Sequence, residues 1–275
     1  MFTLNCKGRL LILNAPVIMG IINMTPDSFF SDSRPFNLHA ALLKAEQMIQ
    51  EGATIIDIGG QSTRPGSDLV SEEEELKRVI AVTELIKKEF PEIYLSIDTF
   101  YAKVARETVN AGADIVNDIS SGSMDENMIP VVAALKVPYI AMHMQGKPKT
   151  MQDKPEYDQV TRNVLDYFIV LMEKLRLAGI LDIIVDPGFG FGKTMEQNFT
   201  LLKELSVFKL LQKPILCGIS RKSMIWKTLA INPDEALNGT TVLNTIGLMN
   251  GTDILRVHDV KEARETIQLF EKYNS

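Results

Sequence analysis

Residues 54–99 read TIIDIGGQSTRPGSDLVSEEEELKRVIAVTELIKKEFPEIYLSIDT, and they contain a strand, a helix and a second strand in succession. The two strand segments, 54–59 and 93–99, are nearly continuously apolar and do not alternate between apolar and polar residues. Such segments are typical of strands that are buried on both faces of a sheet. The stretch therefore predicts a parallel sheet that is covered by helices on both sides.

The segment between these strands has the periodicity and the charge pattern of a helix. Ser71 and Glu74 have the spacing of a capping box, glutamates crowd the start at 72–75, and Lys87 and Lys88 lie near the end. The expected apolar stripe consists of Leu76, Val79, Ile80 and Ile86. We interpret the glutamate run as a solvated helix face without a function of its own.

The same alternation of strand and helix continues along the whole chain. The eight expected strands are residues 18–23, 54–59, 93–99, 115–120, 139–144, 182–186, 214–220 and 254–258. Helical spacing recurs between them, for example in a helix with Asn37 as its expected cap and Gly52 at its end. This order predicts an α/β protein with a single (β/α)₈ TIM barrel, and a doubly wound open sheet is the alternative. We expect residues 1–16 to form an N-terminal β-hairpin that covers the bottom of the barrel.

Composition bounds the class of protein. The 275 residues are 45% hydrophobic, and nothing in their composition marks a boundary between two domains. We therefore expect one domain over residues 1–275. A formal net charge of -6 disfavours a nucleic-acid partner. Cys6 and Cys217 are far apart and indicate neither a disulfide framework nor a cysteine metal site. We expect a cytoplasmic protein, because no apolar run is long enough for a membrane span and no export signal is visible.

Polar side chains follow all eight expected strands. In a TIM barrel the carboxyl ends of the strands share one mouth, and the active site lies there. The residues at these ends are Asn23, 60–66, Asp98, Asn117, Asp118, His143, Asp186, 220–222, Arg256 and His258. We expect roughly a third of them to be caps or supports, with Asp118 and His143 as the leading candidates.

The types of these residues indicate an anionic, aromatic ligand. Asp98, Asn117 and Asp186 suit a flat heterocycle with an amidine or guanidine edge. Arg256 suits a phosphate or the face of a ring. The groups that suit an anion are Thr63, Arg64, His258 and the turn at 220–223.

Two other motifs carry less weight. The segment GFGFGKT at 188–194 has the wrong glycine spacing for a P-loop and follows an Asp-Pro pair, so we reject that interpretation. The three histidines of the chain are too dispersed for a zinc site. We favour instead a partly hydrated Mg²⁺ that is held by Asn23 and a substrate diphosphate.

Six motifs occur in order along nearly the whole chain. They read NMTPDSF at 23–29, QSTRPG at 61–66, SIDT at 96–99, DPGFGFGK at 186–193, SRK at 220–222 and RVHD at 256–259. Together they resemble the pterin-binding TIM-barrel family of dihydropteroate synthases. The resemblance implies condensation of hydroxymethyl-dihydropterin diphosphate with p-aminobenzoate in folate biosynthesis, with Mg²⁺ as cofactor and diphosphate as the second product. It further implies a homodimeric transferase that is a target of sulfonamides.

The resemblance also implies roles for individual residues. The pterin pocket would consist of Asp98, Asn117, Met142, Asp186, Phe191, Lys222 and Arg256. The diphosphate would be bound by Asn23, Thr63, Arg64, Arg256 and His258, with Asn23 as the metal ligand. The p-aminobenzoate would lie against Phe29, Thr63, Pro65, Lys222 and Ser223. The catalytic group would be Arg64, Asp98, Asp186, Lys222 and Arg256.

The sequence departs from the family pattern at two places. After Phe29 it reads FSDSR at 30–34, where the family commonly has Ser-Asp-Gly-Gly. Gln61 stands where Glu is frequent. Both departures lie in or beside the two loops that are expected to close over the reaction.

The expected reaction is a largely dissociative substitution. In this hypothesis Mg²⁺, Arg64, Arg256 and His258 stabilise the departing diphosphate, while Asp98 and Asp186 offset the positive charge that spreads over the pterin. Three alternatives stay open. They are a pterin-binding methyltransferase barrel, which has no need for the basic residues near 64 and 222, a Schiff-base aldolase that uses Lys222, and a non-catalytic pterin-binding relative.

Overall fold

The computed structural model of the protein describes residues 1–24, 34–61, 69–146 and 155–275, with the side chains of 34–37 left out. In these residues eight parallel strands form one sheet in the order β8-β7-β6-β5-β4-β3-β10-β9. The strands are β3 (Val17–Asn23), β4 (Ile55–Gly59), β5 (Tyr94–Asp98), β6 (Ile115–Asp118), β7 (Tyr139–Met142), β8 (Ile183–Asp186), β9 (Leu216–Cys217) and β10 (Ile254–Val257). A parallel bridge between Val185 and Ile215 joins the two edge strands and closes the sheet. The TIM barrel is therefore confirmed, and the open doubly wound sheet is excluded.

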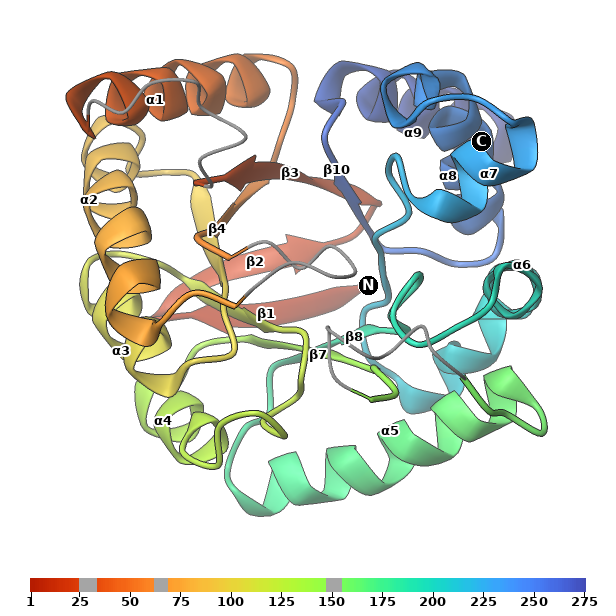
Figure 1. The fold of residues 1–275 in the computed structure, drawn as a ribbon, viewed down its shortest axis with the longest axis horizontal. Helices are drawn as coiled ribbons and strands as arrows, with labels where there is room; N and C mark the ends of the chain where they lie inside the picture. The colour runs from red at the N-terminus through yellow and green to blue at the C-terminus, as the bar shows by residue number, and fades with distance from the viewer. Residues whose placement is uncertain (25–33, 62–68, 147–154) are drawn as a thin grey trace.

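Helices alternate with the strands and form a ring around them (Figure 1). They are α1 (Arg34–Gln50), α2 (Glu72–Glu89), α3 (Ala102–Asn110), α4 (Met128–Leu135), α5 (Val160–Leu177), α6 (Met195–Lys203), α7 (Ser223–Leu229), α8 (Leu237–Met249) and α9 (Val260–Asn274), with 3₁₀ helices η2 (Leu205–Leu211) and η3 (Pro233–Glu235). No helix in the described part of the chain is long and apolar enough to cross a membrane.

Two local expectations can be compared with the helix ends. The cap of α2 is confirmed, because the Ser71 hydroxyl accepts a hydrogen bond from the Glu74 amide at 3.3 Å. The expected cap at Asn37 is wrong, since α1 already begins at Arg34. The proline that follows, Pro35, needs no backbone partner in the first turn of a helix, and its fixed φ suits that position.

The expected N-terminal hairpin is also confirmed. Strands β1 (Phe2–Cys6) and β2 (Arg9–Leu13) pair antiparallel through a two-residue turn at Lys7 and Gly8, which both have positive φ as a type I′ turn requires. The buried hairpin side chains pack against the lowest layer of the barrel interior, which consists of Met19, Ile55, Ile115, Ile140, Ile184, Leu216 and Ile254. The hairpin thus covers the bottom of the barrel, and Figure 1 shows it across the barrel axis.

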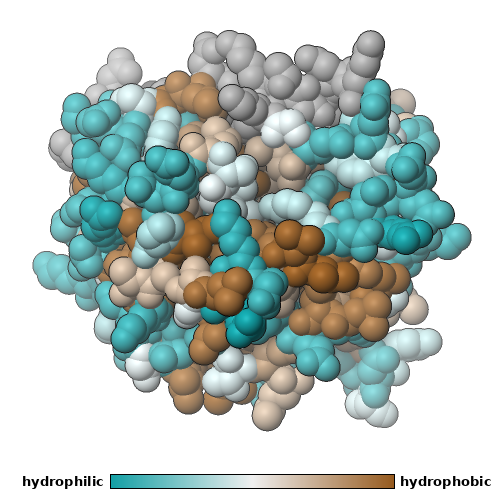
Figure 2. Space-filling view, turned by 90° about the horizontal axis from the view of Figure 1, so that it is seen from below, coloured by the Kyte–Doolittle hydropathy of each residue, from teal (hydrophilic) through white to brown (hydrophobic). Residues whose placement is uncertain are grey.

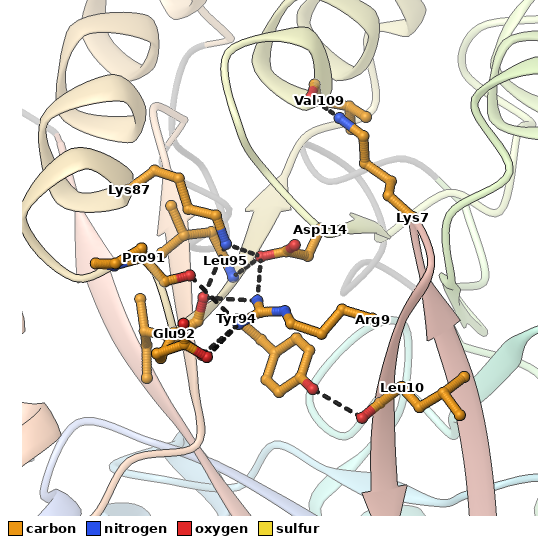
Figure 3. A network of polar contacts seen from close by, with 11 residues as sticks. Lys7, Arg9, Leu10, Lys87, Pro91, Glu92, Tyr94, Leu95, Val109 and Asp114 are labelled. Carbon is orange, nitrogen blue, oxygen red and sulfur yellow. Dashed lines mark hydrogen bonds and ion pairs between the residues drawn. The ribbon is translucent and has the colours of Figure 1, made fainter.

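A polar network ties the hairpin to the strands above it (Figure 3). Asp114, just before β6, accepts hydrogen bonds from Arg9 at 3.2 Å, from Lys87 at 2.9 Å and from the Leu95 amide at 2.9 Å. The Arg9 guanidinium also stacks on the Tyr94 ring, with its carbon 3.9 Å from the ring centroid. One carboxylate therefore joins the hairpin, α2 and β5 at the bottom of the barrel.

Asp114→Asn is expected to lower the free energy of unfolding by about 1–3 kcal/mol, because two cations then lose their shared acceptor charge. Urea denaturation measures this loss, and the carboxyl ends of the strands should be unaffected because the network lies at the opposite, closed end of the barrel. Glu92→Gln is the matched control, since that side chain is 95% exposed and its contact with Arg9 is 3.9 Å long. Equal midpoints for Asp114→Asn and the unaltered chain would contradict the assignment.

Candidate active site

The site residues lie on the layer directly above the apolar floor of the barrel. Side chains in a strand alternate between the two faces, so the residue two positions after a floor residue also points inward. In β4 the floor residue is Ile55, which places Asp57 in the next layer. The same step in the other strands gives Ile21, Ser96, Asn117, Met142, Asp186, Gly218 and Arg256. This second layer of inward-pointing side chains, above the apolar one, forms the base of the mouth.

The register of three neighbouring strand pairs brings the next polar residues into one row. The Cα partners are Asn23 with Gly59, Gly59 with Asp98, and Asp98 with Asn117. A Cβ atom on Gly59 would lie 3.6 Å from the Asn23 Oδ1 atom and 3.5 Å from the Asp98 Cβ atom. Because Gly59 has no side chain, the Asn23 and Asp98 side chains face each other across bare backbone.

A buried ion-pair cluster lies at the centre of the mouth. The Arg256 Nη2 atom is 2.6 Å from the Oδ2 atoms of both Asp57 and Asp98, and its Nε atom donates to Asp57 Oδ2 at 2.7 Å. The Asn117 Nδ2 atom also donates to Asp57 Oδ2, at 3.1 Å. Asp57 is fully buried, and its other oxygen has no hydrogen-bond partner. Asp57 therefore joins Asn117 to Arg256, which in turn binds Asp98.

Asp57 also determines what Asn117 can offer to a ligand. A carboxylate only accepts hydrogen bonds, so the Asn117 amide must direct its NH₂ group toward Asp57. The Asn117 oxygen has no hydrogen bond within the described structure and is left for a ligand. One oxygen of Asp98 is used by Arg256, and one oxygen of Asp186 accepts from the Gly188 amide at 2.8 Å. The three side chains thus present acceptors, which suits a ligand edge that carries N–H donors.

Burial and charge set the protonation of this cluster. Burial raises the pKa of Asp98 well above its ordinary value, and Asp57 adds to this, whereas Arg256 opposes it. For Arg256 burial acts against the charged form, but the two facing carboxylates outweigh it and raise the guanidinium pKa. Arg256 therefore remains charged, and its charge is shared between Asp57 and Asp98.

Lys222 and Asp186 are two further polar residues of the mouth, and their charges influence each other. Burial lowers the pKa of the Lys222 ammonium to about 8, and Asp186 partly restores it. The Lys222 Nζ atom donates to the Phe189 carbonyl and lies 4.8 Å from the centroid of the Phe191 ring. Phe191 and Met142 pack together with Phe100 and Ile119 in a small apolar cluster that is separate from the main core. The predicted pterin residues are thus brought together, with donors, acceptors and an apolar wall.

The rim after β9 and β10 contains the predicted Ser220 and His258. The Ser220 hydroxyl lies 3.0 Å from the His258 Nδ1 atom and accepts from the His258 amide at 3.2 Å. Ser223 is the exposed first residue of α7. The expected contribution of Arg221 to anion binding is wrong, because its guanidinium is paired with both oxygens of Asp259 at 2.8 and 2.9 Å.

Asp118 and His143 have the supporting roles that the sequence predicts. The fully buried Asp118 accepts from the Tyr139 hydroxyl at 2.7 Å and from the amides of Ser120 and Gly122. The His143 Nδ1 atom lies 3.0 Å from the Lys193 ammonium. Burial lowers the pKa of His143 to about 3, so the ring is neutral at pH 7.

Several predicted residues lie outside the described part of the chain. These are Phe29, Thr63, Arg64 and Pro65, together with the departure at 30–33. Gln61 is described, and its side-chain oxygen accepts a hydrogen bond from the Val70 amide at 2.9 Å. Gln61 thus joins the two ends of the segment 62–68.

Glu75 corrects the interpretation of the glutamate run as solvated. It is fully buried, and a Cβ atom on Gly60 would lie 2.9 Å from its Cγ atom. Burial raises its pKa to about 8, so it carries a proton at neutral pH. Helical periodicity contained the signal, since Glu75 precedes the buried Val79 by four residues. Asp57 had a similar signal, as a charged residue in an otherwise apolar strand.

Comparisons with known proteins agree with this geometry. Residues 19–258 match the family described as "Pterin binding enzyme". The dihydropteroate synthase of Escherichia coli (strain K12) is 46% identical over 267 residues, which are 96% of this chain and 94% of that protein. The enzyme of the same name from Haemophilus influenzae is 42% identical and covers 98% of both chains. The Yersinia pestis dihydropteroate synthase in a sulfonamide drug complex superposes with a TM-score of 0.94, at 42% identity and 99% coverage of both chains.

Proposed function

The chain belongs to the pterin-binding enzyme family, and from this premise and the geometry of the barrel mouth we infer that it is a dihydropteroate synthase. It transfers a pterinylmethyl group to p-aminobenzoate in folate biosynthesis, and it is a sulfonamide target like its relative from Yersinia pestis. A relative from Xanthomonas albilineans, with a TM-score of 0.90 and 34% identity over 99% of both chains, is solved in complex with 7,8-dihydropteroate. The observation that carries the inference is the set of acceptors around Asp57 and Arg256.

The pterin ring binds with its donor edge against these acceptors. Asn117, Asp98 and Asp186 accept from the amino group and the ring N–H groups, and Lys222 donates to the opposite side of the ring. Met142 and Phe191 cover the apolar face of the ring. Arg256 lies against the ring with its charge balanced by two carboxylates.

The chemical step depends on the departure of diphosphate. The aromatic amine is neutral at pH 7 and needs no base before it attacks. Asp98 and Asp186 offset the positive charge that spreads over the pterin, and Arg256 and His258 attract the departing anion. Arg64, Thr63, Phe29 and Pro65 keep their predicted roles at the diphosphate and the p-aminobenzoate, and Ser223 borders the amine from the start of α7.

Magnesium is the cofactor that fits this donor set. The described residues contain no group of three or more His, Cys, Asp or Glu side chains that could hold a metal ion. Mg²⁺ keeps several waters and binds through few protein oxygens together with substrate phosphates, a role that the side-chain oxygen of Asn23 suits. Asn23 would hold it, and the ion would supply charge neutralisation at the diphosphate.

The direct test incubates the chain with the pterin diphosphate, p-aminobenzoate and Mg²⁺, and measures dihydropteroate and diphosphate release. We expect both products, and we expect turnover to stop with EDTA and to return with added Mg²⁺. Pterin affinity in calorimetry without amine-dependent diphosphate release would favour a non-catalytic relative instead. Methyl transfer from a methylated pterin would favour the methyltransferase barrel, and borohydride trapping of Lys222 with a carbonyl substrate would favour the aldolase.

We also propose that the chain forms a homodimer through α8 and α9. These adjacent helices form a groove lined by Thr245, Met249, Leu269, Phe270 and Tyr273, and large apolar side chains on its walls are strongly exposed. Light scattering should give a dimer for the unaltered chain and a monomer for Leu269→Glu. Ile169→Glu is the matched control, because Ile169 is an exposed apolar residue of α5. Helix α5 lies at the bottom of Figure 1, and Figure 2, which views the molecule from that side, shows apolar surface there as well. A dimer that survives Leu269→Glu would contradict this interface.

A cytoplasmic location remains a prediction of the same proposal. Both cysteines, Cys6 and Cys217, are free and buried, as in proteins of reducing compartments.

A further inference from the structure

The motif GFGFGKT at 188–194, which is not a P-loop, forms a tight turn against the segment that follows β7. Gly188, Gly190 and Gly192 have φ values of 73°, 81° and 60°, which favour glycine. A Cβ atom on Gly188 would lie 1.9 Å from the His143 carbonyl oxygen, and one on Gly192 would lie 2.4 Å from the Gln145 carbonyl oxygen. The glycines therefore allow the backbone of the turn to pack directly on the backbone after β7.

Lys193 extends into the interior of this turn and is only 2% exposed. Its ammonium donates to the carbonyls of Gly188 at 2.9 Å and Phe191 at 3.1 Å, and it lies 3.0 Å from the His143 Nδ1 atom. All of these partners are neutral, and no carboxylate forms an ion pair with Lys193 in the described structure. An ammonium in such a site is costly, and burial lowers its pKa to about 7. A buried alkyl side chain would cost less, so stability alone does not explain a lysine here.

Lys193 binds the carbonyls of Gly188 and Phe191, and the residues between these two contact side chains of the mouth. Between them, the Phe189 carbonyl accepts from Lys222. Phe191 supplies the aromatic wall, and its amide donates to the Gly188 carbonyl at 3.1 Å. The Gly188 amide in turn donates to Asp186. Asp186 and Lys222 are thus bonded to residues 188 and 189, within the stretch whose carbonyls Lys193 binds.

We propose that Lys193 is a positioning residue for pterin binding, whose ammonium ties the Gly188 and Phe191 carbonyls to His143 and so sets Phe191 and the Phe189 carbonyl that holds Lys222. The proposal rests on the proposed function for its substrate. It concerns the pterin half of the site first, because Asp186, Lys222 and Phe191, which the turn holds or contains, are all expected at the pterin.

The test compares Lys193→Met, which keeps the length of the side chain but removes its donors, with Lys193→Gln, whose amide can still donate two hydrogen bonds. We expect Lys193→Met to raise the KM for the pterin diphosphate and the calorimetric Kd for pterin by about tenfold or more. The KM for p-aminobenzoate should rise less, because Lys222 is the one residue expected at that substrate that the turn holds. Lys193→Gln should recover part of the pterin affinity.

Two controls separate positioning from stability. Asp114→Asn weakens the barrel at its bottom, so it should lower the free energy of unfolding and leave both KM values unchanged. Lys203→Met, at an exposed lysine at the end of α6, should behave like the unaltered chain.

An unchanged pterin Kd in Lys193→Met would overturn the proposal, as would equal rises in both KM values. Loss of the fold in both Lys193 variants would also overturn it, because the lysine would then serve the barrel and not the pocket. If the unaltered chain makes no dihydropteroate, the proposed function fails, but the pterin Kd values still test Lys193.

Discussion

Asp186→Asn is expected to lower the turnover number by about 100- to 1,000-fold while the fold remains intact. In the proposed reaction this carboxylate, which interacts with the charge of Lys222, offsets the positive charge that develops on the pterin, and asparagine has no charge to do so. The shape of the site should persist, because the asparagine oxygen can still accept from the Gly188 amide. The loss should therefore appear in the chemical step and not in the structure.

The same change alters two pH dependences in predictable directions. Asp186 is the main group that raises the Lys222 pKa against burial, so in Asp186→Asn that pKa should fall below about 8 and the pH profile of turnover should shift to lower pH. Burial raises the pKa of Asp186 itself, and a carboxyl group of this kind costs stability as the pH rises through its folded-state pKa. Asp186→Asn removes this cost, so unfolding free energy at pH 8 should be equal or slightly higher.

Single-turnover rates and urea unfolding curves measure these effects. Asp182→Asn is the matched control, since it replaces a carboxylate just before β8, at the opposite end of the same strand. It should keep the rate of the unaltered chain. If Asp186→Asn turned over within about twofold of the unaltered chain, its role in charge stabilisation would be refuted.

Arg256→Met is expected to abolish turnover and to lower the free energy of unfolding by about 3–5 kcal/mol. The methionine fills a similar volume but leaves the buried carboxylates of Asp57 and Asp98 without their cation. Uncompensated buried charge is the costliest outcome of losing one partner of an ion pair. The loss should therefore far exceed that of Arg221→Met, whose partner Asp259 is more exposed, with 19% of its side chain accessible against 10% for Asp98.

The pH dependence of this loss follows from Asp98. Arg256 opposes the rise of the Asp98 pKa, so in Arg256→Met that pKa should rise further. A carboxyl group with a raised folded-state pKa contributes stability at acid pH, below its ordinary value of about 4, and loses it as the pH rises through the raised value. The difference between Arg256→Met and the unaltered chain should accordingly grow from pH 5 to pH 8.

Urea denaturation at these two pH values is the measurement, and the double variant with Asp98→Asn tests the cause. Removing one of the two unpaired carboxylates should restore part of the stability at pH 8. If Arg256→Met is as stable as the unaltered chain at pH 8, the ion pairs of Arg256 with Asp57 and Asp98 do not contribute to the free energy of unfolding as we expect.

The order of strands and helices was determined by the sequence alone. Each expected strand matches an observed one, because continuous apolar runs and helical spacing are local signals. The main difference is β9, which was expected over 214–220 and is observed over Leu216–Cys217 only. The chain leaves the strand conformation soon after Cys217, and Arg221 has a positive φ of 55°. The residues at the strand ends were also predictable, because a TIM barrel collects all carboxyl ends at one mouth.

The contacts inside the mouth were decided only by the tertiary structure. Arg256 and Asn117 both bind Asp57, although they are separated from it in the sequence by 199 and 60 residues. No local sequence pattern predicts contacts between residues so far apart. These contacts depend on the register of the strands, because a shift of one residue would turn each side chain to the opposite face of the sheet. Burial has the same origin, since the charged forms of Glu75 and Lys193 become costly only when neighbouring elements exclude water from these side chains. Sequence periodicity thus determines which residues face inward, whereas closure of the barrel determines which of them form ion pairs and hydrogen bonds with one another.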